Sequence, residues 1–128
     1  RCQPVTGVQT CALPIFGPRP MVRITLYWGG SALVGLESLG HSGSAPRGQD
    51  VVCAAVSALV HGLLLGLSDV AEVRDLRCEA DLDVPLIRVS WPEEAADSLD
   101  LLTRTVALSL KEIESGYPGY VSITEVQR

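Results

Sequence analysis

The sequence of 128 residues has no surplus of positive charge, because ten Lys and Arg residues stand against fifteen Asp and Glu residues, a net charge of −5. A nucleic-acid binder needs a Lys/Arg surplus on at least one face, so this balance argues against that class of protein. Four cysteines are too few for a disulfide-stabilised toxin or growth-factor module. With 47% hydrophobic residues, the chain has the composition of a globular protein, and its length fits one domain.

The common motifs for metals and nucleotides are missing as well. The histidines and the cysteines of residues 21–128 show none of the paired short spacings that zinc sites use. The glycines match neither a phosphate-binding P-loop nor a dinucleotide-binding fingerprint. We therefore expect no metal and no cofactor.

Residues 1–20 contain no acidic residue, although they hold four of the eight prolines and two of the four cysteines. Their apolar stretch is too short for a secretory signal, and the letters VTGVQTCALPI resemble translated sequencing-adapter DNA. We expect residues 1–20 to be a non-native or disordered leader and residues 21–128 to form the domain. That domain has eight basic and fifteen acidic residues, a net charge of −7, and two cysteines. It is predicted to be reduced and cytoplasmic, with no export signal.

The pattern of apolar residues predicts five strands and two helices. The strands are expected at 22–27, 32–39, 74–83, 86–91 and 120–126, and the helices at 50–67 and 92–116. Gly29 and Gly30 predict a hairpin between the first two strands. The order β-β-α-β-β-α-β predicts a single α+β domain, with one mixed or antiparallel sheet and two helices packed on it.

The first predicted helix contains no formal charge between positions 51 and 67, which is near the lower limit for a membrane span. His61 lies inside it and no basic flank orients it, so a buried central helix is the better interpretation. Gly62 and Gly66 are four residues apart and would let another backbone approach closely, in a helix–helix or dimer contact.

A candidate nucleophile lies near the start of this helix. If Asp50 is the N-cap, Cys53 is the third helical residue, where the helix dipole favours the thiolate. Cysteine is also among the most buried residue types, so Cys53 could simply pack as a small hydrophobe. Asp50 could cap the helix only, or also orient a histidine. Ser57 follows one turn later on the same face, where its hydroxyl could bond to the Cys53 carbonyl or line the site.

His41 precedes Cys53 by twelve residues, across a loop marked by Gly40, Gly43 and Gly48. An imidazole folded back onto the helix start could pair with the thiolate and act as general base and acid. A surface histidine is the alternative. His61 lies about 12 Å along the helix from Cys53 and is predicted to be structural. Cys78, in the middle of a predicted strand, is expected in the core.

The letters GH at Gly40 and the run DVVCAAVSA from Asp50 resemble the signature of the bacterial ribosomal-processing cysteine proteases, the Prp family. The resemblance covers the chain from position 21 onward. It places the family's nucleophile on Cys53, its histidine on His41, and its acidic residue and serine on Asp50 and Ser57. It implies a cytoplasmic homodimer that removes the N-terminal extension of a large-subunit ribosomal protein, with no direct nucleic-acid or membrane contact.

Two other functions compete with this one. In the first, the chain is a non-enzymatic ribosome-assembly or interaction module in which Cys53 is merely packed. In the second, it is a thiol redox sensor, since a low-pKa accessible cysteine is also what oxidation needs. The expectation that Cys78 is buried counts against the sensor, because it leaves Cys53 without a resolving partner.

Overall fold

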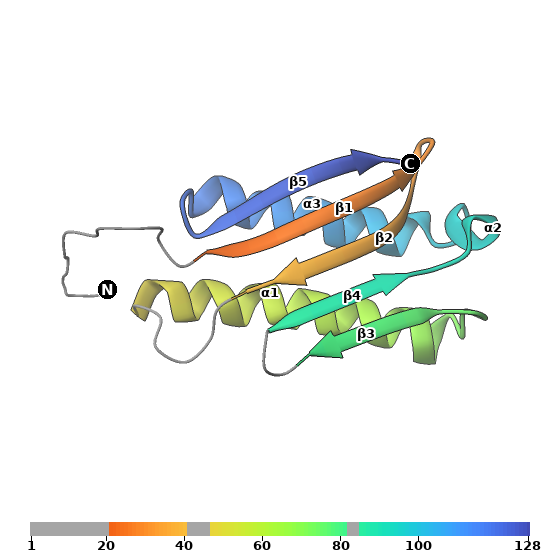
Figure 1. Ribbon diagram of the computed structural model, residues 1–128, viewed down its shortest axis with the longest axis horizontal. Helices are drawn as coiled ribbons and strands as arrows, with labels where there is room; N and C mark the ends of the chain where they lie inside the picture. Colours follow the sequence, from red (N-terminus) through yellow and green to blue (C-terminus); the bar gives the residue numbers. More distant parts are fainter. Residues whose placement is uncertain (1–20, 41–46, 82–84) are drawn as a thin grey trace.

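The computed structural model describes residues 21–40, 47–81 and 85–128, which form one five-stranded sheet with helices on one of its faces (Figure 1). In chain order, the elements are β1 (Val22–Gly29), β2 (Ala32–Leu39), α1 (Arg47–Leu65), a π-helical turn (Gly66–Val70), β3 (Arg77–Asp81), β4 (Leu86–Ser90), α2 (Glu93–Ala96), α3 (Asp100–Gly116) and β5 (Val121–Gln127). The strand order is β3-β4-β2-β1-β5, with β1 parallel to β5 and the other neighbours antiparallel. The predicted α+β class and mixed sheet are confirmed.

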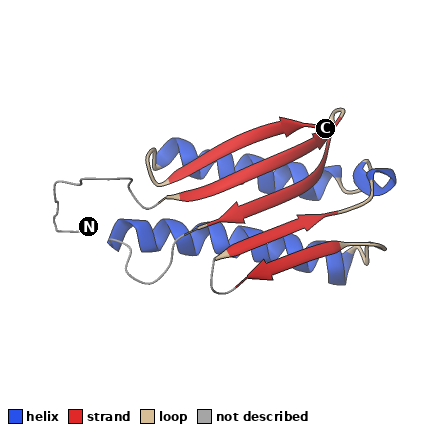
Figure 2. Ribbon diagram, in the orientation of Figure 1, coloured by secondary structure: helices blue, strands red, loops and turns tan. Residues whose placement is uncertain are grey.

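The central hairpin follows from strict alternation in β1. Val22, Ile24 and Leu26 are at most 2% exposed, because all three face the helices. The turn to β2 passes through Gly30, whose φ of +71° is a conformation that favours glycine. The predicted hairpin is therefore confirmed. Its apolar face packs against the two long helices, which lie on the same side of the sheet (Figure 2).

α1 contacts the core through one stripe of side chains. Its members, each at most 2% exposed, are Val52, Val56, Val60, Leu63 and Leu67, the last in the π-helical turn. On the opposite side, Val51 and Leu65 are 61% and 58% exposed. The prediction of a buried central helix is therefore wrong for this outward side, because a single sheet can cover only one side of a helix.

By length and composition, Val51–Val70 is one window among the described residues that is long and apolar enough to cross a membrane. A third of the window is buried inside the structure. The stripe from Val52 to Leu67 belongs to the same apolar cluster as the sheet, as expected of a core helix in a folded domain.

The two glycines of this helix have different surroundings. A Cβ on Gly66 would come within 2.8 Å of Leu102 on α3, so this glycine allows the two helices to approach closely. A Cβ on Gly62 would meet nothing within 4 Å. The predicted close approach is thus confirmed at Gly66, within the chain, whereas Gly62 faces open space.

The second predicted helix is divided into α2 and α3. α2 follows Pro92 at its N-cap and has two acidic residues in its first turn, which the helix dipole favours, but the chain turns at Asp97 to Leu99. The Ser98 hydroxyl donates to the Ala95 carbonyl at 2.9 Å, and such side-chain bonds compete with helical ones. The helix then resumes as α3, whose side facing the sheet includes the fully buried Leu110.

β3 is an edge strand and all five of its residues are exposed. Cys78 pairs with Val89 on the helix side of the sheet, yet it is exposed. The expectation that Cys78 lies in the core is wrong, because the burial seen at Val89 does not extend to the outermost strand.

The sheet face away from α1 and α3 carries charged side chains. Arg88 bridges Glu37 and Glu79 across three strands, with N–O distances of 2.6 and 2.8 Å. Hydrogen bonds to Glu37 first, and then to Glu79, raise the pKa of Arg88 above its ordinary value. Charged pairs of this kind are typical of a sheet face that contacts water.

One buried polar atom makes a test of the core possible. The Thr103 hydroxyl is fully buried and has no hydrogen-bond partner among the residues that the structure describes. We expect Thr103→Val to raise the free energy of unfolding by about 1 kcal/mol, because the shape is kept and the desolvation penalty is removed. Denaturant titration measures this change.

The matched control is Thr105→Val, because Thr105 is exposed and its hydroxyl donates to the Leu101 carbonyl. Its free energy of unfolding should change by less than about 0.5 kcal/mol. A Thr103→Val protein less stable than the Thr105→Val protein would contradict this account of the core.

Candidate active site

Cys53 is held by α1 on the flank of the buried stripe. It is half-buried and packs against the apolar core, while the preceding Val52 is 1% exposed. Gly66 marks the flank of the helix that faces α3, and Cys53 lies about 140° around the axis from it at 100° per residue. The thiol is therefore anchored by packing on a side of α1 turned away from α3.

The helix begins earlier than expected, which changes the electrostatics of Cys53. α1 starts at Arg47, just after Pro46, and proline is well tolerated at a helix start. Asp50 therefore lies within the first turn, so its prediction as N-cap is wrong. Cys53 is the seventh helical residue instead of the third. The helix dipole acts mainly within the first turn, so any activation of this thiol needs a neighbouring charge.

Ser57 and His61 follow Cys53 at intervals of one turn, and both are exposed. His61 Nδ1 donates to the Ser57 carbonyl at 2.8 Å, which ties the imidazole to its own helix. This contact agrees with the structural role predicted for His61. Ser57 keeps its predicted position one turn from Cys53.

The segment before His41 is anchored at the end of β2. The Gly40 N–H donates to the Pro85 carbonyl at 3.0 Å, and a Cβ on Gly40 would lie 3.4 Å from Val22. His41 and Gly43 lie outside the described residues, as does the side chain of Asp50. The roles of His41 and Asp50 stay predictions.

Gly48 was expected in the loop between His41 and Cys53, but it lies in the first turn of α1. The connection from Gly40 to the helix is correspondingly shorter. It enters α1 at Arg47, at the end of the molecule where β2 finishes and β5 begins (Figure 1).

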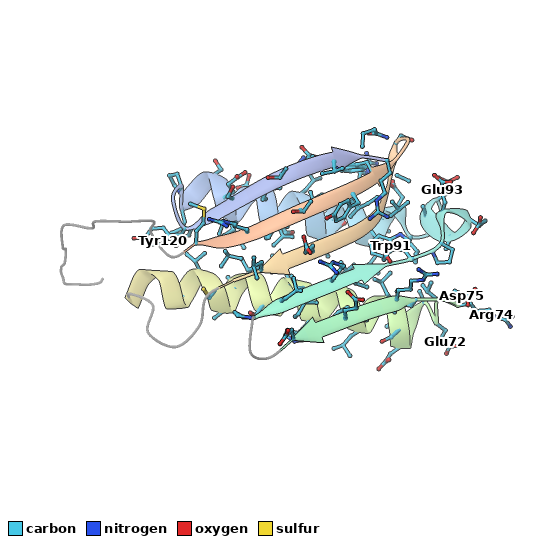
Figure 3. The ribbon with its side chains drawn as sticks, viewed as in Figure 1. Glu72, Arg74, Asp75, Trp91, Glu93 and Tyr120 are labelled. Carbon is cyan, nitrogen blue, oxygen red and sulfur yellow. The ribbon has the colours of Figure 1, made fainter. Side chains whose placement is uncertain are left out.

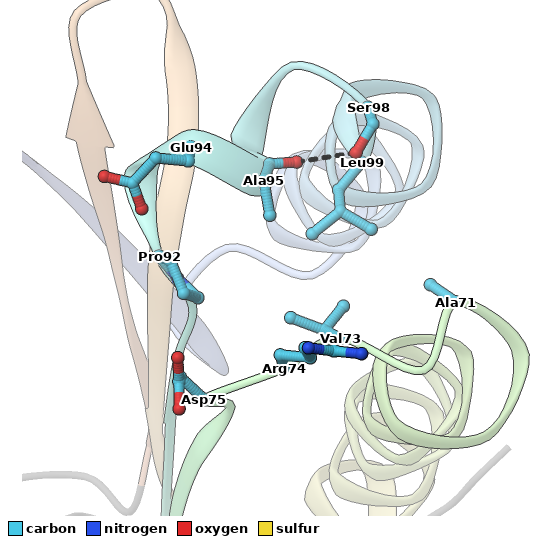
Figure 4. Close-up of a pocket in the computed structure, with 9 residues that line it drawn as sticks. All are labelled: Ala71, Val73, Arg74, Asp75, Pro92, Glu94, Ala95, Ser98 and Leu99. Atoms are coloured by element: carbon cyan, nitrogen blue, oxygen red, sulfur yellow. Dashed lines mark hydrogen bonds between the residues drawn. The ribbon is translucent and has the colours of Figure 1, made fainter.

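A cavity of about 580 Å³ lies apart from Cys53 and its neighbours on α1. Its lining residues are Ala71, Val73, Arg74, Asp75, Pro92, Glu94, Ala95, Ser98 and Leu99 (Figure 4). Figure 3 shows Arg74 and Asp75 at one end of the molecule and Tyr120 at the other. α1 begins at the same end as Tyr120, so the cavity lies at the end away from the start of α1. The cavity contains no cysteine or histidine, and its one hydroxyl is committed to the Ala95 carbonyl. It does not supply the nucleophile of a thiol enzyme.

In the described part of the chain, no three His, Cys, Asp or Glu side chains lie close enough together to bind a metal ion. The cysteines among the described residues are Cys53 and Cys78. Of these two, only Cys53 combines an anchored position with partial exposure, which is the environment expected of a reactive cysteine.

Comparison with known proteins gives the same chemistry. The family model of the cysteine protease Prp matches residues 21–122. A curated relative from Mycoplasma pneumoniae, the ribosomal processing cysteine protease Prp, is 29% identical over 93 residues, covering 73% of this chain and 88% of its own length.

Solved structures share the fold. A Streptococcus mutans protein superposes with a TM-score of 0.76 at 24% identity, over 85% of this chain and 97% of that one. The Staphylococcus aureus ribosomal processing protease Prp, in complex with a substrate peptide, gives 0.74 at 19% identity, over 83% and 100%. The same protease with a covalently linked product peptide gives 0.68 at 19%, over 83% and 100%. The family match over most of the chain shows that this protein belongs to the Prp family of ribosomal-processing cysteine proteases and is a cysteine-type peptidase.

Proposed function

We propose that this peptidase removes the N-terminal extension of a large-subunit ribosomal protein in the cytoplasm, with Cys53 as nucleophile and His41 as general acid and base. Membership of the Prp family supports the reaction class, and the similarity to the Mycoplasma ribosomal processing cysteine protease supports a ribosomal substrate. The position of Cys53 carries the assignment of the nucleophile: its thiol is held against the core by a rigid helix and stays partly exposed.

Cys78 is the competing thiol, and its surroundings argue against it. It lies on an edge strand whose residues are all exposed, so its side chain is less constrained by packing than that of Cys53. Nucleophilic catalysis needs reacting atoms kept in fixed alignment. Cys53 meets that need because the residues on both sides of it in the helix, Val52 and Val56, are buried.

The proposed reaction is acyl transfer in two steps. The Cys53 thiolate attacks the scissile carbonyl, the peptide C–N bond breaks, and the His41 imidazolium protonates the leaving amine. Water then attacks the thioester, giving up a proton to His41, and the thiolate leaves to release the carboxylate product. The covalent product peptide seen in the Staphylococcus aureus relative supports an intermediate of this kind.

The start of α1 at Arg47 bears on which N–H groups could stabilise the oxyanion. A helix leaves its first four N–H groups without intrahelical partners, which here are those of residues 47–50. The Cys53 N–H lies beyond these four groups. It is therefore less available to bind an oxyanion than it would be in a helix that began with Asp50 as its N-cap. Donors for the oxyanion are therefore expected from the start of the helix or from the segment that carries His41.

Replacing the nucleophile tests the proposal directly. Cys53→Ala should leave a folded protein whose cleavage of ribosomal-protein precursors falls by at least about 1000-fold, because no thioester can form. Mass spectrometry of precursors incubated with the protein measures the products. Cys78→Ala is the matched control and should cleave normally, since it removes the same atoms from an exposed edge strand. Unimpaired cleavage by the Cys53→Ala protein would overturn the assignment.

The thiolate can be observed without a substrate. We expect iodoacetamide to alkylate Cys53 with an apparent pKa below the free value of about 8.5, and His41→Ala to move that pKa up to it. The direction follows because an imidazolium favours the thiolate, while the helix start is too distant to do so alone. The rate of alkylation against pH gives the pKa, and alkylation of Cys78 serves as the internal reference.

Two outcomes would favour the competing functions. A pKa near the free value that is unchanged in the His41→Ala protein would point to the binding module. Reversible inhibition by peroxide without any peptide cleavage would point to the redox sensor.

A further inference from the structure

The cavity at the end of the molecule away from the start of α1 has an apolar floor. We call it the distal cavity. Leu99 is 5% exposed, and Val73 and Ala95 pack against the same apolar core. The side chains of Val73 and Leu99 point toward each other in Figure 4. With a volume of about 580 Å³, the distal cavity is large enough to hold a ligand or a partner's side chains.

Both walls of the distal cavity are held in place by the rest of the fold. The Val73 N–H donates to the Leu67 carbonyl at 2.9 Å. Glu72 and Asp75, with φ values of 50° and 60°, keep a left-handed conformation that residues other than glycine rarely adopt. On the opposite wall, the indole of the buried Trp91 donates to a carbonyl of β2 at 2.9 Å. A preformed cavity of this kind loses little conformational freedom when it is filled.

Acidic side chains surround the apolar floor. Asp75 and Glu94 belong to the lining, and Figure 3 shows Glu93 at the same end of the molecule. The two segments that supply the lining, 69–75 and 92–100, hold seven acidic residues and one basic residue. Their net charge of −6 is nearly all of the −7 that the predicted domain carries. The distal cavity is therefore the place where this acidic protein attracts cations most strongly.

Several classes of ligand do not suit this combination of an apolar floor and acidic walls. A phosphate group, a nucleic acid or an anionic membrane would meet repulsion from the acidic segments. A metal ion needs several converging donors, and the described residues hold no such group. A peptide that carries Lys or Arg beside an aliphatic side chain suits both features, because the aliphatic group fills the floor while the cation reaches Asp75 or Glu94.

We propose that the distal cavity is an exosite, a second substrate-binding site apart from the catalytic residues, and that it holds a Lys/Arg-rich segment of the substrate. This proposal rests on the proposed function, in which the substrate is a ribosomal protein. Such a protein contacts RNA phosphates through Lys and Arg, so its mature part is basic. No charged residue occurs from Val51 to Ser68, so the attraction acts beyond the far end of α1.

The separation of the exosite from Cys53 determines which part of the substrate reaches it. Ala71 follows Cys53 by eighteen residues, along α1 and the π-helical turn, which span about 25 Å. An extended chain covers about 3.3 Å per residue, so about eight residues must separate the scissile bond from the segment in the exosite. The exosite therefore binds the mature part of the substrate, and a short peptide around the scissile bond reaches only Cys53.

Direct binding tests the exosite without any cleavage. The probe is a labelled synthetic peptide composed of Lys and Leu, and fluorescence anisotropy follows its titration with the full chain. We expect Glu94→Lys to raise the dissociation constant about tenfold at low salt. Asp75→Asn, which tolerates the left-handed backbone, should raise it about threefold. Arg74→Ala should lower it about threefold, because Arg74 is a cation in the lining.

The matched control is Glu112→Lys, which makes the same change in net charge at an exposed position near the end of α3, where β5 follows (Figure 1). It should change the dissociation constant by less than about twofold. Circular dichroism verifies that all variants are folded. An equal effect of Glu94→Lys and Glu112→Lys would overturn the proposal, and so would equally tight binding of a peptide composed of Ser and Leu.

Cleavage kinetics separate the exosite from the active site. Glu94→Lys should raise KM for full-length ribosomal-protein precursors about tenfold and leave kcat unchanged, because the exosite binds the substrate and the transition state equally. Cleavage of a short peptide that ends about five residues beyond the scissile bond should not change, because it cannot reach the exosite. A variant that impairs both substrates equally, or neither of them, would overturn the exosite. If the wild-type protein cleaved neither substrate, the proposed function would fail, and the peptide titration would still decide whether the distal cavity binds basic segments.

Discussion

Burial of the stripe from Val52 to Leu67 against the β1–β2 hairpin is the interaction on which the rest of this structure depends. Each of these aliphatic side chains contributes about 1.5–3 kcal/mol when fully buried. Together with Ile24, Leu26 and Leu36 of the hairpin, they form one apolar cluster. The stripe determines both the position of α1 over the sheet and its rotation about its own axis.

That rotation determines the exposure of every other residue on the helix. Cys53 follows the fully buried Val52 by one residue, so it lies at the boundary between core and solvent. A reactive thiol needs such a boundary, because full burial would raise the pKa of the thiol and full exposure would leave its position undefined. On the far side, the same rotation turns Val51 and Leu65 outward.

The position of β3 at the edge of the sheet explains why Cys78 is exposed. Val89 of β4 is 1% exposed, whereas Cys78, its neighbour on β3, is exposed. Both residues belong to alternating apolar patterns and both face the helix side. Burial in a two-layer fold thus depends on the distance of a strand from the helices, which local alternation does not encode.

Local sequence patterns were enough to predict the α+β class, the strands β1 and β2, and the hairpin that Gly29 and Gly30 mark between them, because strand alternation, 3.6-residue spacing and turn residues are local properties. The DVVCAA run likewise identified the family and the candidate nucleophile. Tertiary structure decided that Cys78 is exposed, that the second helix is divided between Ala96 and Asp100, and that α1 begins at Arg47. It also decided that the uncharged part of α1, from Val51 onward, is buried on one side only. These features depend on how elements distant in the sequence pack against one another, and local sequence patterns do not specify that packing.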